Sequence, residues 1–572
     1  SAALATQAEV GSENRVQIDH GVLSNRNGAT VDISGAASIA LDHVLAGGSG
    51  QWLNVDRSST AAGLANLDLA TSVVTGSAQT ASGSTANLAM HDTSIWQLTG
   101  NSNLSSLSND ASLIDFSAPV GDSFKTLSVN RYQGANGTIA LNTYLFDDAS
   151  PSDLLVIDGG TASGQTNLQI KNAGGAGALT TGNGIKVVDA INNGTTDSNA
   201  FRLLSEVKAG PYQYTLHRAS LDDSNGEAWY LRSTTGEAGD DTPNYRKETS
   251  LYAGIPVQAL LYSRAMVDTL HERVGEERRL ASVDPLLDED DSAFGPSMGW
   301  GRMIYRRGVD NRGAVDYDYD LRAVQVGTDL YRSEDSDGST NQAGLSLALG
   351  RMTGSLQHTD GRYAGDDALR AYSLGGYWTH FGPAGWYLDG VLQLSRFSAT
   401  AKPDSVEKLH TRGHGVTASL EAGYPFLVHL DKEIYVEPQA QVIVSKISLK
   451  DAGDSAADVR FDDVESVTGR LGVRVARDWF RTDDKGDIHR TNGWLRPSVW
   501  HEFKGAPKAE FSSSNGYVPF TADMGGTWGE VNLGVDYQLN DRTSVTGSVG
   551  YQKAFDGDSR SYEGMFGIKV KF

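Results

Sequence analysis

The chain has 572 residues, a net charge of −23, 65 glycines and no cysteine. It is too long for one compact domain, and its acidic balance argues against nucleic-acid binding, because contacts with phosphates need a basic surface. No stretch approaches the ~18 consecutive apolar residues of a membrane-spanning helix. Ser1–Ala5 lacks the basic and apolar parts of a secretion signal, so we expect a mature or truncated form.

Residues 1–119 consist of short apolar segments separated by Gly, Ser, Asn, Asp and Thr. Two of these segments, Ile95–Leu98 and Leu113–Phe116, lie about twenty residues apart, an interval typical of solenoid repeats. We therefore predict a right-handed parallel β-helix over this region. A β-sandwich with short strands is the alternative.

Residues 120–232 contain longer and more aromatic segments. The end of a solenoid needs a cap, because its unpaired backbone would otherwise pair with other chains. Tyr212–Leu216 and Trp229–Leu231 predict a hairpin with bulky side chains, and the turn-forming residues 219–228 lie between them. We expect residues 120–232 to form the cap of the β-helix.

A polar linker at residues 233–250 precedes the one convincing helix, predicted at 251–280. Its core is Pro256–Val274, in which proline suits the first turn. Nineteen residues extend ~28 Å, close to the thickness of the hydrocarbon core of a bilayer. Contact with lipid is excluded by polar side chains, which include Gln258, Arg264, Asp268, His271 and Arg273. Such a helix fits a water-filled pore; a surface helix on a soluble domain is the alternative.

After a predicted turn at 281–293, residues 294–572 alternate between apolar and polar side chains for most of their length. An apolar outside and a polar inside, at ~10 residues per strand, are typical of an outer-membrane β-barrel. We predict twelve antiparallel strands, which begin near Met298, Asp318, Gln342, Ala368, Gly385, His410, Ile434, Glu465, Thr491, Thr527, Thr543 and Ser559. The fold class is therefore mainly β: a β-helix with its cap, a helix in a pore, and a barrel.

The alternation also assigns side chains to the two faces of the barrel wall. In the last strand the apolar face carries Tyr562, Phe566, Ile568, Val570 and Phe572. Charged side chains that would be costly against lipid are expected to face the lumen and the helix; these are Asp389, Glu421, Glu437, Arg470, Arg474, Glu530 and Asp536.

The lengths of the connections predict the orientation of the barrel. Phe381–Gly385, His429–Glu433 and Leu539–Arg542 are tight and follow even-numbered strands, whereas the longest connection, Gly505–Gly526, follows the ninth. Short turns are periplasmic and long loops extracellular in such barrels. Both barrel termini are then periplasmic, and the helix must run up through the pore to residues 1–244 outside the cell.

Several runs resemble the autotransporters of type Va secretion, in particular the AIDA and pertactin-like group. The linker and helix resemble them at Pro243–Tyr252 and Asp268–Arg273, and the barrel strands at Leu420–Phe426, Glu437–Gln441, Arg470–Arg474 and the terminal Phe572. Residues 100–232 are similar to the autochaperone-containing end of a secreted passenger.

The resemblance implies a Gram-negative outer-membrane protein with its passenger at the cell surface. It also implies that the barrel-assembly machinery reads the C-terminal strand and that the cap helps the passenger to fold. Expected partners are outer-membrane lipid and lipopolysaccharide, periplasmic chaperones, and a host surface ligand of the passenger. We expect a monomeric barrel, no nucleic acid and no cofactor.

Catalytic motifs are weak. Gly121-Asp122-Ser123 lacks the small residues of a protease nucleophile after it, and His271-Glu272 lacks the second His of a zinc-protease helix. His410 and His414 share a strand face without a third ligand. We therefore predict no catalytic or metal site and an adhesive or binding passenger. The alternatives are a secretion unit whose protease or esterase domain lies upstream, and a soluble β-protein.

Overall fold

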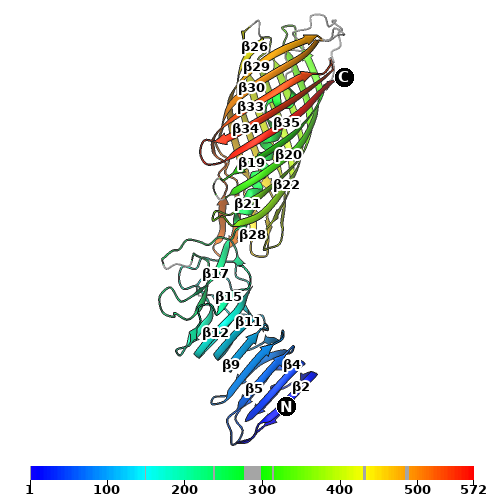
Figure 1. Cartoon of the computed structure of the whole chain (residues 1–572). Coiled ribbons are helices and arrows are strands. Elements are labelled where there is room, and N and C mark those ends of the chain that lie inside the picture. Colours follow the sequence, from blue (N-terminus) through cyan, green and yellow to red (C-terminus); the bar gives the residue numbers. More distant parts are fainter. Residues whose placement is uncertain are drawn as a thin grey trace. The chain divides into compact units, whose positions relative to one another are not determined.

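The computed structural model describes residues 2–148, 150–235, 239–275, 298–311, 313, 315–429, 433–482, 488–540 and 542–572. The chain divides into two compact units (Figure 1). The first comprises Ser1–Arg246 and Ser512–Gly516, and the second Lys247–Phe511 and Tyr517–Phe572. The predicted turn at 281–293 and the predicted helical residues 276–280 lie outside the described residues.

The first unit begins with strands that pair in parallel with the strand one turn further along the chain. They are β1 (Leu4–Gln7), β2 (Asn14–Ser24), β3 (Val31–Ser34), β4 (Ala36–Asp56), β5 (Leu64–Ala70), β6 (Val73–Thr80), β7 (Thr85–His91), β8 (Ile95–Leu98), β9 (Ser102–Asp110), β10 (Leu113–Phe116), β11 (Thr126–Thr143) and β12 (Leu154–Asn172). In this ladder Val73 lies opposite Ile95, and Ile95 opposite Leu113. The predicted β-helix is confirmed, with β8 and β10 at the predicted bounds.

The interior of the solenoid is apolar, because alternate side chains of every strand point inward. Trp52 and Trp96 are fully buried there and pack edge to face, with ring centroids 6.0 Å apart. The Trp96 indole N–H donates to the Gly76 carbonyl oxygen at 2.9 Å, so its polar atom is paired inside the core.

The end of the solenoid combines strands that still pair in parallel with β12 and strands that pair antiparallel with one another. The last strands are β13 (Ile185–Ile191), β14 (Thr195–Thr196), β15 (Phe201–Leu203), β16 (Val207–Ala209), β17 (Tyr212–Arg218) and β18 (Trp229–Arg232). β17 and β18 form the predicted hairpin, and β18 also pairs antiparallel with β13. Trp229 is buried and donates from its indole N–H to the Thr196 hydroxyl at 3.0 Å, which covers the end of the core.

The second unit begins with two helices, α1 (Glu248–Val267) and α2 (Leu270–Val274). The prediction that Pro256 opens the helix is wrong, because α1 starts eight residues earlier and runs through Pro256. The single helix predicted to Val274 is also wrong, because it is interrupted at Asp268 and Thr269. Within the described ranges, no helix has the length and apolar character needed to cross a membrane.

The rest of the second unit is a closed antiparallel barrel of twelve strands, as predicted. They are β19 (Met298–Asp310), β20 (Asp316–Glu334), β21 (Thr340–Gln357), β22 (Tyr363–Phe381), β23 (Tyr387–Lys402), β24 (Leu409–Gly423), β26 (Ile434–Leu449), β29 (Val464–Thr482), β30 (Ile488–Glu502), β33 (Gly526–Gln538), β34 (Thr543–Ala554) and β35 (Arg560–Lys571). The short β25 (Phe426–His429) continues β24 along β26. The first strand, β19, pairs with the last, β35, and closes the cylinder.

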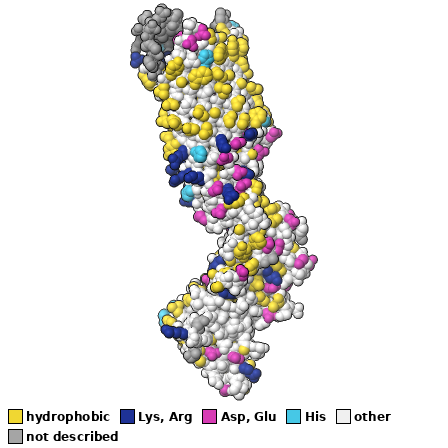
Figure 2. Space-filling model, turned by 180° about the vertical axis from the view of Figure 1, so that it is seen from behind, with side chains coloured by type: hydrophobic (Ala, Val, Ile, Leu, Met, Phe, Trp, Pro, Cys, Tyr) yellow, Lys and Arg dark blue, Asp and Glu magenta, His cyan; other side chains and the backbone are white. Residues whose placement is uncertain are grey.

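The two faces of the barrel wall differ in chemistry. Along β24, Val416 and Leu420 are exposed, whereas Thr417 and Ser419 between them and Glu421 after them are buried. Figure 2 shows hydrophobic side chains spread over the outer surface of the barrel, with charged side chains gathered toward one end. The outside is thus suited to lipid and the inside to polar contacts.

Two of the longer connections between barrel strands carry strands of their own. They are β27 (Ala452–Gly453) and β28 (Asp458–Phe461) in one connection, and β31 (Lys508–Ser513) and β32 (Gly516–Thr521) in the other. β28 pairs with β31, so the two connections join in a small four-stranded sheet. The longest predicted loop, Gly505–Gly526, is therefore largely a hairpin.

Candidate functional site in the barrel lumen

Helices α1 and α2 lie inside the barrel, and nearly all of their side chains are buried. Gln258 contacts Tyr317 and Asp367 of the barrel wall, and the Tyr262 hydroxyl lies 2.9 Å from the Ser373 hydroxyl. Arg264 forms a buried ion pair with Glu502 of β30. The helix is therefore fixed to the wall by polar contacts along its length.

The break between the helices has a local cause. Asp268 adopts a φ of 38°, and its backbone no longer continues α1. Thr269 caps α2, because its hydroxyl accepts from the Glu272 amide N–H at 3.4 Å. Thr269-Leu270-His271-Glu272 is a capping box, the pattern that starts a helix, so the sequence contains a signal for this break that the periodicity of the helix masks.

Around the break, three carboxylates meet three arginines. Oxygen atoms of Asp268, Glu272 and Glu563 lie within 4.8 Å of one another. Arg302 pairs with Asp268 at 3.1 Å, Arg496 with Glu272 at 2.7 Å, and Arg306 donates to Glu563 at 2.7 Å. Because each carboxylate has its own guanidinium, the cluster is a network of ion pairs and its charge is balanced without a metal ion.

The short helix α2 is held from the opposite side by β23, β24 and β26. Arg273 pairs with Asp389 at 2.5 Å, and the Leu270 amide N–H donates to Glu421 at 2.9 Å. His271 lies 3.7 Å from Glu437. Of the helix residues singled out from the sequence, Gln258, Arg264, Asp268, His271 and Arg273 thus all contact the barrel wall.

The seven charged residues assigned to the lumen from the alternation are all buried in the structure. Asp389, Glu421 and Glu437 contact α2, as described above. Arg470 pairs with Glu421 at 3.0 Å. The other three bind wall residues: Arg474 donates to Asn492, Glu530 accepts from Trp500, and Asp536 accepts from Trp494.

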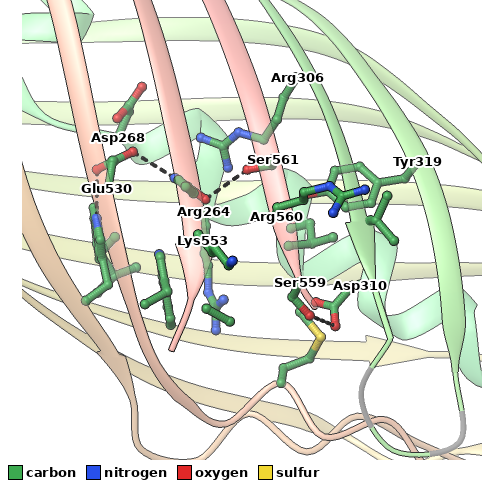
Figure 3. Close-up of a pocket in the computed structure, with 18 residues that line it drawn as sticks. Arg264, Asp268, Arg306, Asp310, Tyr319, Glu530, Lys553, Ser559, Arg560 and Ser561 are labelled. Atoms are coloured by element: carbon green, nitrogen blue, oxygen red, sulfur yellow. Dashed lines mark hydrogen bonds between the residues drawn. The ribbon is translucent and has the colours of Figure 1, made fainter. Parts of the chain in front are cut away.

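A cavity of about 80 Å³ remains beside α1, where β19, β34 and β35 meet (Figure 3). It is lined by charges of both signs, among them Arg264, Asp268, Arg306 and Glu530. The Ser559 hydroxyl donates to Asp310 at 2.9 Å at its edge. The volume is sufficient for a few water molecules. The lumen next to the helix is thus a small space lined both by charged side chains and by apolar ones such as Leu261 and Trp528.

The last strand presents its apolar side chains outward. Tyr562, Phe566, Ile568 and Phe572 are exposed on the barrel surface, and Val570 is half-buried. The Phe572 ring lies directly over Gly299 of the first strand, where a Cβ atom would be 2.7 Å from the ring. The terminal residue therefore packs across the seam at which the barrel closes.

The residues weighed as catalytic or metal-binding candidates from the sequence lie in separate parts of the structure. Asp122 and Ser123 are exposed in a turn of the first unit, and His410 and His414 face outward on β24. His271 packs edge to face on Tyr387 inside the lumen. None of these positions gathers a nucleophile with a base within the described residues.

Two family models match the chain. Residues 102–216 match Autochaperone Domain Type 1, and residues 299–550 match the Autotransporter beta-domain. The chain is 27% identical to the adhesin BmaC autotransporter of Brucella suis, over 79% of this chain and 14% of that protein. It is 26% identical to the autotransporter adhesin AIDA-I of Escherichia coli, over 78% and 34% respectively. It is 27% identical to the pertactin autotransporter of Bordetella bronchiseptica, over 81% and 51%.

The chain thus spans less than two thirds of the length of each of these three relatives. The two matched regions coincide with the end of the solenoid and with the barrel. The apolar wall of the barrel belongs in the Gram-negative outer membrane. With its solenoid, its helix-filled barrel and both family matches, the chain belongs to the autotransporters.

Proposed function

We propose that this autotransporter displays an adhesive or binding passenger on the cell surface. The filling of the barrel lumen by α1 and α2 supports an anchoring role most directly. A helix held to the wall by buried ion pairs such as Arg496–Glu272 does not slide freely through the pore. The segment that follows the solenoid is therefore fixed in the barrel, and the passenger remains attached to the membrane.

We propose the following domain organisation and domain roles along the chain. Residues 1–119 are passenger β-helix, 120–232 its cap and autochaperone region, and 233–250 the linker. The division is completed by the segments predicted from the sequence as the pore helix (251–280), the periplasmic turn (281–293) and the translocator (294–572). The tight connection after β22, which spans 382–386, supports a periplasmic location for that end of the barrel. Residues 1–244 are then outside the cell.

The adhesive role of the passenger rests on two supports. Two of the relatives are named adhesins. The solenoid in addition offers a long surface of stacked strands on which a host ligand can bind. The second candidate function is a secretion unit for a protease or esterase domain carried upstream of this chain. The outer-membrane lipid, its lipopolysaccharide and the host ligand are the partners in this proposal.

We propose that the terminal strand directs the assembly of the barrel, which we expect to be a monomer. Its outward face, Tyr562, Phe566, Ile568, Val570 and Phe572, gives the barrel-assembly machinery a regular apolar pattern to bind while periplasmic chaperones keep the chain unfolded. The pairing of β35 with β19 supports this role, because the last strand must be placed before the cylinder can close.

Protease treatment of intact cells tests the display. The chain is produced with a secretion signal and an epitope at its N-terminus in a Gram-negative host. Proteinase K is expected to remove the epitope while a fragment containing the helix and the barrel survives. An epitope that is cut only after the outer membrane is broken would contradict surface display.

Binding of the same cells to cultured epithelial cells tests adhesion. Cells that display the whole chain are compared with cells that display a variant lacking residues 1–119, at matched surface amounts. We expect the deletion to reduce binding. Equal binding by the two strains would contradict the adhesive role while leaving surface display intact.

A further inference from the structure

Two Asp-His pairs lie at the same corner of consecutive turns of the solenoid. Asp19-His20 is in β2 and Asp42-His43 is in β4, and the parallel register places Asp19 opposite Asp42. Both histidines have a positive φ, 56° and 53°, which turns the chain at this corner. The register therefore brings together residues that are far apart in the sequence.

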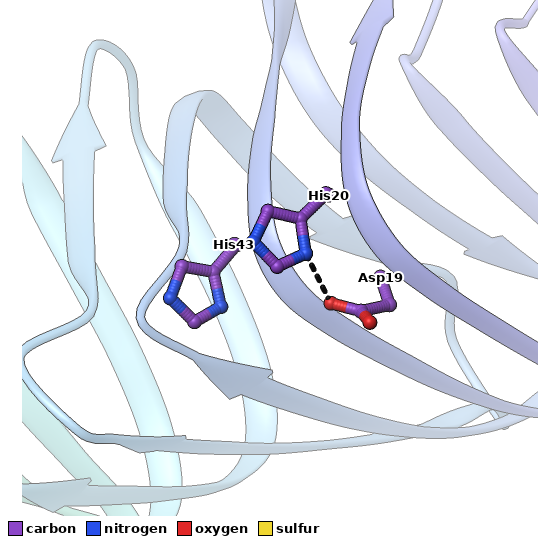
Figure 4. A group of neighbouring side chains, drawn as sticks. All are labelled: Asp19, His20 and His43. Carbon is purple, nitrogen blue, oxygen red and sulfur yellow. Dashed lines mark hydrogen bonds and ion pairs between the residues drawn. The ribbon is translucent and has the colours of Figure 1, made fainter.

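The two imidazole rings face each other across the ladder (Figure 4). Their centroids are 4.5 Å apart, and their planes differ by 6°. The His20 Nδ1 atom lies 2.6 Å from an Asp19 oxygen, and the His43 Nδ1 atom 2.7 Å from an Asp42 oxygen. All four side chains are open to solvent. Each ring is oriented by its own carboxylate, and the pair is accessible.

We propose that Asp19, His20 and His43 form a surface site for a divalent transition-metal ion such as Zn²⁺. One ligand atom from each of the three residues lies within 4.8 Å of the other two. Imidazole nitrogen favours Zn²⁺, Ni²⁺ and Cu²⁺ over Mg²⁺ and Ca²⁺, and carboxylate oxygen completes such a set. Asp42 is positioned to serve as a further ligand or to orient His43.

The two rings must turn before they bind one ion, because the nitrogen lone pairs of stacked imidazoles point along parallel lines in their ring planes. Ligand atoms lie about 2.0–2.2 Å from zinc, which places neighbouring donors of a tetrahedral site roughly 3.3–3.6 Å apart. The three donors lie within 4.8 Å of one another, so they must be rearranged around the ion. Exposed side chains can do this by rotation, whereas the backbone ladder keeps the two turns about 4.8 Å apart. The carboxylates of Asp19 and Asp42 add negative charge that favours a cation.

A third histidine on the same side of the solenoid provides a matched comparison. His91 lies 3.0 Å from Asp68 and 2.8 Å from Asp92, and it is also partly exposed. The register places Ala70 opposite it, so no second imidazole is available from that neighbouring turn. His91 has the carboxylates of the proposed site without its paired imidazoles.

Calorimetric titration of the full chain in detergent, without a histidine tag, tests the proposal. With ZnCl₂ at pH 7.5 we expect one ion to bind, and His20→Asn and His43→Asn each to weaken binding at least about tenfold. Asparagine tolerates positive φ, so both variants should keep the turn. His91→Asn is the control and should bind as the unchanged protein does. An excess of Mg²⁺ should not compete.

The absence of zinc binding, or equal binding by His20→Asn and the unchanged protein, would overturn the proposal. Electron paramagnetic resonance of one equivalent of Cu²⁺ on the unchanged chain gives a second readout that needs no variant. Coupling to two imidazole nitrogens supports the site. A spectrum with one nitrogen or none would overturn it.

Discussion

Arg273 of α2 donates to Asp389 of β23 at 2.5 Å, and both side chains are almost completely buried. The pair joins the helix in the pore to the barrel wall. Removing one partner of a buried ion pair leaves the other charge without compensation, which typically costs about 3–5 kcal/mol.

We therefore expect Arg273→Ala and Asp389→Ala each to lower the temperature at which the folded barrel unfolds on SDS gels. In the double variant, the unfolding temperature should fall by less than the sum of the two single decreases, because no buried charge is left without a partner. Arg362→Ala is the control, since its pair with Asp360 is partly exposed and should contribute little. Additive losses in the double variant would contradict a direct coupling between helix and wall.

The outward face of β33 gives a test of the lipid-facing surface. Leu533 lies in the middle of this strand and is 56% exposed, whereas Leu539 lies just beyond its end. Arginine near the centre of the bilayer costs about 2–4 kcal/mol, and near its edge only about 0–1 kcal/mol. Leu533→Arg should therefore reduce the amount of folded protein in the outer membrane, and Leu539→Arg should not. Equal yields of the two variants would contradict the assigned face.

The terminal strand gives a test of barrel closure. Deletion of Phe572 and the substitution Phe566→Asp should both impair assembly, because they alter the outward face of the strand that closes the barrel. Phe555→Asp is the control, since Phe555 is equally apolar and exposed but lies beyond the end of β34. Heat-modifiable mobility on cold SDS gels measures the folded fraction. A normal folded band for both test variants would refute the assignment.

The helices should determine the conductance of the barrel. We expect removal of residues 248–274 to open the lumen and to raise the single-channel conductance in planar bilayers, because α1 and α2 fill the space between the strands. The unchanged chain is the control. If both proteins conduct alike, the helices do not close the pore.

The cap of the solenoid should be sensitive to acid through Glu227. Burial by itself would raise the pKa of this carboxyl, but the Thr196 amide N–H and the Arg218 guanidinium, each 2.6 Å away, lower it overall. The pKa of Glu227 is thus lower in the folded protein than in the unfolded chain. Its ionised carboxylate therefore stabilises the fold at pH values above the ordinary pKa of 4.5, and this stabilisation is lost as the pH falls through the pKa of the folded state.

Glu227→Gln should therefore lower the melting temperature of the solenoid at pH 7, measured by tryptophan fluorescence. The difference from the unchanged protein should shrink at pH 3. Asp223→Asn is a control on the same hairpin, since Asp223 is exposed and asparagine tolerates its positive φ of 57°. A difference that stays constant between the two pH values would exclude the Glu227 carboxylate as its cause.

Much of the barrel follows from the sequence alone, because the alternation of side chains across a strand is a local property. Leu533 and Asn532 are neighbours, and their chemistry suffices to place one outside and the other inside. Ile95–Leu98 and Leu113–Phe116 are strands for the same reason, and their spacing indicates the turn length of the solenoid.

The tertiary structure decided what depends on distant parts of the chain. Nothing local determines that Arg496 meets Glu272, or that His20 stacks on His43, because strand register depends on every pairing around the barrel or along the solenoid. The helical segment illustrates both cases. The capping box that begins α2 at Thr269 can be recognised in the sequence, whereas the continuation of α1 through Pro256 depends on the barrel wall that encloses it.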